Sequence, residues 1–80
     1  MTNLEKLNQI FCEVYSVKES ALNETFINTE VDTWDSIHQL SMVAAIEEAF
    51  DLLIDTEDVL EMISYESVKN LLTTKYEIAF

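Results

Sequence analysis

The chain has 80 residues, enough for one small domain, and its 16 acidic residues against 4 lysines give a net charge of −12. This charge repels phosphate, so it excludes nucleic acid as a partner and argues against anionic membranes. One cysteine excludes an internal disulfide, and one cysteine with one histidine cannot form a structural zinc site, so we expect a reducing, cytoplasmic setting and no metal. We also expect a monomer.

The acids are concentrated in the middle of the chain. Thirteen of them lie between Lys18 and Lys69, where there is no basic residue. We therefore expect a partner protein with a basic patch, attracted by electrostatic steering. The alternative is that these acids only keep the domain soluble.

Residues 3–16 are predicted to form the first helix. Its apolar residues recur at three- and four-residue steps: Leu4, Leu7, Phe11 and Val14. Thr2 and Glu5 match a capping box at its start. The segment has neither the basic start nor the apolar run of a signal peptide. Cys12 lies beside the apolar stripe, so we expect a buried, unreactive thiol.

Residues 17–35 lose this period, and we expect a long loop there. Scattered apolar side chains should attach it to the core: Leu22, Phe26, Val31 and Trp34. A loop of this length is uncommon in a compact domain and is usually functional.

Residues 36–51 are the clearest helix, with Asp35 as its expected N-cap. At about 100° per residue, one side carries the expected core stripe: Met42, Val43, Ile46, Ala49 and Phe50. The opposite side has apolar residues near its start and acids towards its end: Ile37, Leu40, Ser41, Ala44, Glu47, Glu48 and Asp51. We interpret it as a docking face with an apolar centre and an acidic rim. In the alternative interpretation, Ile37 and Leu40 tuck under the long loop.

Two more helices complete the prediction. Asp55 and Thr56 should cap a short helix over residues 57–62, and Ser64 should cap a last helix. The last helix has one apolar face: Val68, Leu71, Leu72 and Tyr76. The expected fold is all-α, a four-helix bundle of three longer helices and one short helix with a long loop between the first and second, in a single domain over residues 1–80.

Ser36 opens the second helix directly after Asp35 and has three interpretations. It can be a plain polar residue of a helix start, a nucleophile with His38 as its base, or a site that other enzymes modify. The nucleophile is rejected, because positions i and i+2 of a helix point apart and the chain has no glycine to build a nucleophile elbow. We expect His38 to be a surface histidine.

Asp35-Ser36-Ile37, opening an acidic helix after a long loop, resembles the Asp-Ser-Leu motif of acyl carrier proteins. The likeness continues through LSMVAAIEEAFDLLID, which is similar to the second helix of that family with its Glu-Glu-x-Phe-Asp end. The acidic stretch TEDVLEMI and the last helix follow in family order. The resemblance covers nearly the whole chain and is most specific over residues 31–62.

The resemblance implies that Ser36 carries 4'-phosphopantetheine, transferred covalently from coenzyme A by a phosphopantetheinyl transferase, with Asp35 contributing to recognition. The thiol of that group holds acyl intermediates as thioesters, so the chain would be a carrier and not an enzyme. The implied partners are acyl-activating, acyl-transferring or condensing enzymes with basic docking patches. The predicted docking residues are Ile37, Leu40, Ala44, Glu47, Glu48, Asp51, Glu57, Asp58 and Glu61.

Several positions depart from the carriers of fatty-acid synthesis. Residues 31–34 read Val-Asp-Thr-Trp in place of the common Leu-Gly-Ala. Ser41 stands where an acid is usual, Ala44 where a larger apolar residue is usual, and Asp55 where a proline is customary. These departures argue against the general fatty-acid role, and Trp34-Asp35-Ser36 resembles stand-alone carriers dedicated to one biosynthetic pathway. The alternatives are a carrier of general fatty-acid synthesis, an aminoacyl or peptidyl carrier and, more remotely, an unmodified acidic adaptor protein.

Overall fold

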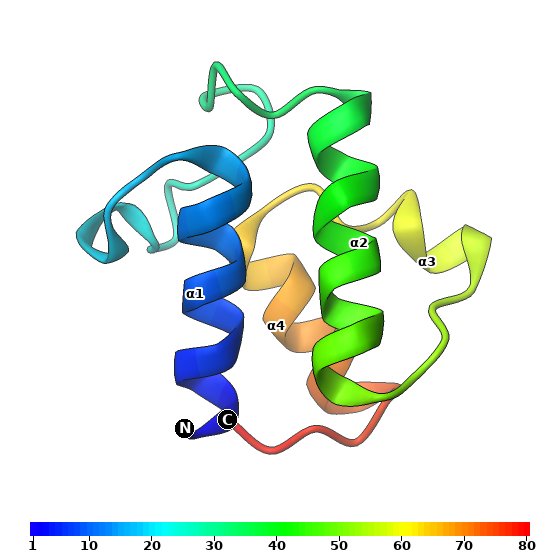
Figure 1. Ribbon diagram of the computed structural model, residues 1–80. Helices are drawn as coiled ribbons and strands as arrows, with labels where there is room; N and C mark the ends of the chain where they lie inside the picture. Colours follow the sequence, from blue (N-terminus) through cyan, green and yellow to red (C-terminus); the bar gives the residue numbers. More distant parts are fainter.

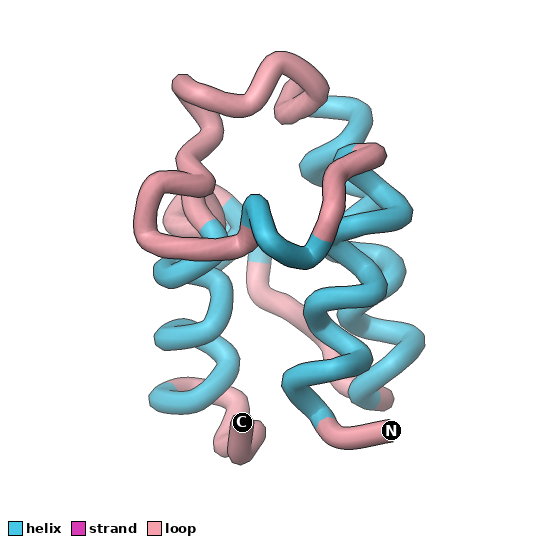
Figure 2. Tube along the Cα trace, turned by 90° about the vertical axis from the view of Figure 1, so that its left-hand side faces the viewer, coloured by secondary structure: helices cyan, strands magenta, loops and turns pink.

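Four α-helices and one 3₁₀ turn make up the regular structure of the computed structural model, which describes residues 1–80 (Figure 1). In chain order they are α1 (Asn3–Tyr15), η1 (Glu19–Ala21), α2 (Ser36–Phe50), α3 (Thr56–Val59) and α4 (Tyr65–Thr74). There are no strands, as Figure 2 shows, and only Ile27 and Ser64 form an isolated bridge. The all-α prediction is confirmed, with three longer helices and one short one, and the arrangement is compatible with a small helical bundle. No helix combines the length and apolar character needed to cross a membrane.

The predicted caps explain where the longer helices begin. Thr2 and Glu5 form the expected capping box on α1, and Asp35 caps α2 by accepting a hydrogen bond from the His38 amide. Ser64 caps α4, with Ser67 returning the second bond of the box. The prediction for α3 was less accurate, because this helix spans Thr56–Val59 and Asp55 makes no side-chain cap bond.

Two helices end on residues that adopt the left-handed backbone conformation. Ser16 follows α1 with φ of 56°, and Asp51 follows α2 with φ of 52°. Glycine normally occupies such positions, because a Cβ atom makes this conformation cost roughly 1–2 kcal/mol. The chain contains no glycine, so Ser16 and Asp51 occupy these positions at the cost of local backbone strain.

The core lies where α1, α2 and α4 meet, with α1 and α2 antiparallel and in contact (Figure 1). It consists of thirteen buried residues: Leu7, Ile10, Phe11, Tyr15, Phe26, Trp34, Met42, Val43, Ile46, Met62, Tyr65, Val68 and Leu72. Three expectations were wrong. Leu4 and Ala49 are exposed, and Cys12 is only half-buried because it lies at the border of the α1 stripe. Burial still raises the pKa of the Cys12 thiol, and nearby Glu19 and Glu13 raise it further.

Residues 16–35, which connect α1 to α2, are attached to the rest of the protein at several points. The Asn28 amide donates to the Ile63 carbonyl at 2.8 Å, and the Tyr65 amide donates to the Phe26 carbonyl at 3.0 Å. Phe26 and Trp34 are buried, as predicted, while Leu22 and Val31 are partly buried against the core. These contacts fix the segment that leads into the start of α2.

Candidate functional site

Ser36 is the first residue of α2, and Asp35 performs the capping that a serine could otherwise provide. The Asp35 carboxylate accepts a hydrogen bond from the His38 amide at 2.8 Å. No side-chain hydrogen bond in the structure involves the Ser36 hydroxyl, and Ser36 is exposed. Ser36 is therefore an exposed residue of the first turn of α2 and not its cap, and its hydroxyl is open to solvent.

His38 holds the Asp35 carboxylate in place next to Ser36. The Asp35 carboxylate accepts from the His38 amide and also lies 2.7 Å from the Nδ1 atom of the imidazole ring. These bonds, led by the one from the backbone amide, lower the pKa of Asp35 below its ordinary value of 3.8. Asp35 is therefore ionised at neutral pH. The His38 ring is bonded to Asp35, and no hydrogen bond joins it to the Ser36 hydroxyl.

Trp34 anchors the residues just before the serine. Its ring stacks on Tyr15 with centroids 4.7 Å apart and meets Phe11 edge-on at 6.0 Å. The neighbouring Thr33 hydroxyl donates to the Tyr15 carbonyl at 2.8 Å. Aromatic contacts of this kind add about 0.5–1.5 kcal/mol beyond the burial of apolar area. The backbone on the N-terminal side of Ser36 is thus held to α1.

Gln39, which is not among the predicted site residues, connects this anchor to the segment around α3. Its side-chain oxygen accepts a hydrogen bond from the Trp34 indole N–H. Its nitrogen donates to the carbonyls of Val59 and Met62, each at 2.9 Å. A single polar residue within the first turn or so of a predicted helix gives no sequence signal for such a role. The three bonds join the loop, α2 and the end of α3 into one unit.

The apolar centre of the predicted docking face is exposed. The exposed fractions of Ile37 and Leu40 are 73% and 63%, so the alternative that they tuck under the loop is wrong. Five other predicted docking residues are also exposed: Ala44, Glu48, Asp51, Glu57 and Glu61. A surface with apolar residues beside uncompensated acids is therefore present along α2 and α3.

Two predicted docking acids have structural roles instead. Asp58 is buried, and its carboxylate lies 2.6 Å from the Lys75 ammonium and accepts a 2.7 Å hydrogen bond from the Tyr76 hydroxyl. Glu47 is half-buried and accepts from the Ile54 amide at 2.9 Å, which holds the chain after α2. Asp58 was wrongly assigned to the docking surface, because Lys75 and Tyr76 are distant in sequence and fold back onto α3.

Exposed apolar residues also lie near α3, outside the predicted docking residues. Leu53, before α3, has an exposed fraction of 83%, and Leu60, directly after it, has one of 78%. Ile63 is also exposed. The run LIDTEDVLEMI mixes acids with apolar residues. Because α3 has only 4 residues, a helical wheel cannot predict which of these side chains are exposed.

Most of the acids have no cationic partner. Lys75 contacts Asp55 and Asp58, and Lys69 lies 3.6 Å from Glu66. No group of three or more histidine, cysteine or acidic residues is arranged to hold a metal ion. The negative charge around α2 and α3 therefore stays largely uncompensated within the protein.

Comparison with protein-family models and with curated protein sequences finds no match for this chain.

Proposed function

We propose that this protein is a carrier of the acyl carrier protein type, in which Ser36 is esterified by 4'-phosphopantetheine. The observation that carries the proposal is the state of Ser36, which is exposed, held in position by its neighbours and free of any capping bond because Asp35 supplies that bond. A hydroxyl that stabilises nothing in its own fold suits modification by another enzyme. The resemblance of Asp35-Ser36-Ile37 to the family motif indicates that this modification is the attachment of 4'-phosphopantetheine.

The start of α2 is chemically suited to a phosphodiester. The first amides of a helix have no partners inside it and, with the helix dipole, favour an anion at this end. Asp35 opposes this as a neighbouring negative charge, but its carboxylate is bound by His38. Nothing packs over the Ser36 side chain, so an attached group has room to extend into solvent.

In the proposed modification, the Ser36 hydroxyl oxygen loses its proton and forms a phosphodiester bond, while the nucleotide part of coenzyme A leaves with the broken phosphoanhydride oxygen. A phosphopantetheinyl transferase provides the active site and its metal ion. When bound, the group supplies a thiol that holds acyl chains as thioesters. The chain itself catalyses nothing and is not an enzyme.

The exposed face along α2 and α3 would bind the partner enzymes. Ile37 and Leu40 supply apolar contact, while Glu48, Asp51 and Glu57 supply charge for a basic patch. Acids at the edge of such a contact mainly raise the association rate and fix orientation. The partners we propose are acyl-activating, acyl-transferring or condensing enzymes.

We assign the carrier to a dedicated biosynthetic pathway in the cytoplasm. The support is the Trp34 anchor, which replaces the residues common before the serine in fatty-acid-synthesis carriers. We further propose that the four helices form the family's bundle as a single carrier domain that acts as a monomer.

Incubation with coenzyme A and a promiscuous phosphopantetheinyl transferase tests the proposal by mass spectrometry. The wild type should gain one prosthetic group, and Ser36→Ala should gain none. Ser41→Ala is the matched control, because Ser41 is an exposed serine of the same helix, and it should be modified like the wild type. The proposal fails if several such transferases add nothing, or if Ser36→Ala is still modified.

The same experiment separates this proposal from an unmodified acidic adaptor. The exposed Ile37 and Leu40 beside unpaired acids would also suit an adaptor that binds basic proteins. An adaptor would carry no prosthetic group when purified from its native cell, and its partner binding would be indifferent to Ser36→Ala.

A further inference from the structure

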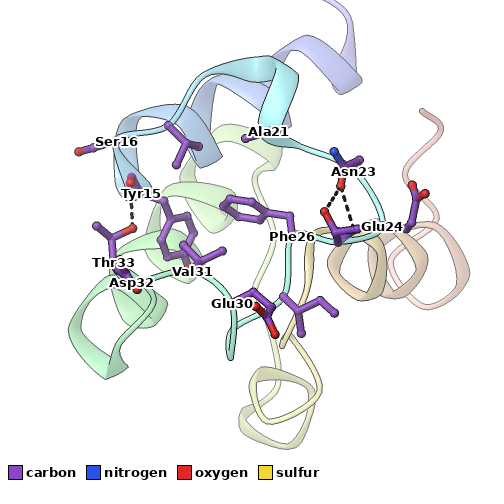
Figure 3. Close-up of a pocket in the computed structure, with 13 residues that line it drawn as sticks. Tyr15, Ser16, Ala21, Asn23, Glu24, Phe26, Glu30, Val31, Asp32 and Thr33 are labelled. Carbon is purple, nitrogen blue, oxygen red and sulfur yellow. Dashed lines mark hydrogen bonds between the residues drawn. The ribbon is translucent and has the colours of Figure 1, made fainter.

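A groove lies between the end of α1, η1 and the segment that leads to α2 (Figure 3). Its volume is about 790 Å³, within the range of about 300–1,000 Å³ typical of binding pockets. Figure 3 shows Tyr15, Phe26 and Val31 grouped at its base, and Val17 and Ala21 also line it. Phe26 and Tyr15 are buried, while Val17, Ala21 and Val31 are partly exposed. The base of this loop groove is therefore apolar and partly open to solvent.

The rim of the loop groove is acidic. Glu24, Glu30 and Asp32 line it, all three are exposed, and none makes an ion pair. No lysine lines the groove, although Lys18 follows Val17 directly in the sequence. An apolar base with an unpaired acidic rim is complementary to a ligand that is apolar at its centre and cationic at its edges.

We propose that the loop groove is a second docking surface that binds a basic amphipathic segment of a partner protein, with an apolar side chain over the partly exposed Val17 and Val31 and lysines or arginines at the acidic rim. The groove shares no residue with the docking face along α2 and α3. A second copy of this chain is a poor occupant, because a net charge of −12 would have to approach three more acids. An anionic lipid surface is disfavoured for the same reason.

The groove is accessible without local unfolding, which makes it suitable for recognition. The segment that forms its wall is fixed by the bond from Thr33 to the Tyr15 carbonyl and by the bond from Thr25 to the Asn23 side chain at 2.8 Å. A preformed surface requires little ordering when the partner binds. The proposal goes beyond the carrier function and does not depend on modification of Ser36.

A synthetic amphipathic peptide of leucine and lysine, about 14 residues long with leucines at three- and four-residue steps, provides the probe. It is titrated into the unmodified, isotopically labelled protein and followed by nuclear magnetic resonance. The amides of Val17, Phe26 and Val31 should shift with a saturating isotherm. A peptide of the same composition in scrambled order, which has charge but no apolar face, should shift them much less.

Two triple variants with equal changes of net charge sharpen the test. Glu24→Gln, Glu30→Gln and Asp32→Asn should weaken the groove isotherm about tenfold, the combined effect of three surface ion pairs.

The matched control neutralises three acids of the other face: Glu48→Gln, Asp51→Asn and Glu57→Gln. It should weaken the groove isotherm only slightly, through the shared loss of long-range attraction. Four results would each overturn the proposal. The two triple variants could weaken peptide binding equally, or the chemical-shift changes could be confined to α2 and α3. The scrambled peptide could bind equally well, or the groove amides could shift with protein concentration in the absence of peptide. Ser36→Ala should leave the isotherm unchanged, so a failure of the carrier proposal would not alter this result.

Discussion

Replacing Gln39 by leucine should destabilise the protein and loosen the region after α3. The substitution removes the acceptor of the Trp34 indole N–H and the donor to the carbonyls of Val59 and Met62. Each such bond contributes about 0.5–1.5 kcal/mol, and an orphaned buried donor costs about 1–3 kcal/mol. Water can reach part of this half-buried site, so we expect a loss of about 2–3 kcal/mol. For 80 residues the whole stability is about 4–12 kcal/mol, so the change should be easy to measure.

Urea unfolding followed by the fluorescence of Trp34, the only tryptophan, provides the measurement. With a slope near 1 kcal/mol per molar, the midpoint should fall by about 2–3 M. Hydrogen exchange should also accelerate at the amides of Val59 and Met62, because the bonds from Gln39 hold this turn to α2. A midpoint that moves by less than about 0.5 M, together with unchanged exchange in this turn, would refute this role of Gln39.

Gln39→Glu separates the two halves of this link. Glutamate keeps an oxygen to accept from Trp34 but brings its second oxygen towards the carbonyls of Val59 and Met62. We expect faster exchange after α3 with a nearly unchanged native fluorescence maximum of Trp34. A shifted native fluorescence maximum of Trp34 in Gln39→Glu but not in Gln39→Leu would contradict the role of the Gln39 oxygen as the acceptor of the indole N–H.

Three further perturbations test other parts of the structure. Ser16→Gly should raise the free energy of unfolding by about 1 kcal/mol in urea unfolding, because Ser16 has a positive φ, whereas Ser16→Ala should bring no such gain. Hydrogen bonds from Lys75, and then from Tyr76, lower the pKa of Asp58 below 3.8, so this carboxylate stabilises the fold above that pH and loses the effect as pH falls through its folded pKa. The difference in melting temperature between wild type and Asp58→Asn should therefore stay constant down to about pH 5 and narrow as the pH falls below about 4, and a difference that stays constant there would contradict the ion pair. Adding about 0.5 M sodium chloride should raise the melting temperature of the wild type, because most of its acids are unpaired, and no rise would mean that they repel one another little.

The helices and their starts could be predicted because their signals are local. Thr2, Asp35 and Ser64 each act within three residues of their own position, so their caps follow from the sequence and are present in the structure. The burial of Phe26 and Trp34 was also predictable, since aromatic residues in a polar segment have few other favourable places.

What the sequence could not predict depends on contacts between distant residues. Asp58 was placed on the docking surface because nothing in its neighbourhood indicates that Lys75 and Tyr76 fold back onto it. Gln39 gave no signal because its partners at Val59 and Met62 are backbone carbonyls, whose position depends on the tertiary fold. The loop groove was missed for the same reason, since a segment without periodicity does not reveal which of its side chains lie together.

Asp58 and Glu47 have structural roles, so they contribute less than predicted to the negative surface that a partner would meet. Asp58 is neutralised by Lys75 and buried, so it steers nothing, while Glu24, Glu30 and Asp32 remain unpaired on the other side of the serine in the sequence. In Figure 1 the start of α2 stands between the connecting segment and α3. The uncompensated charge is therefore divided between two surfaces that flank Ser36. Under the two proposals together, the carrier would be held through the loop groove by one partner while its α2 and α3 face stays free for another.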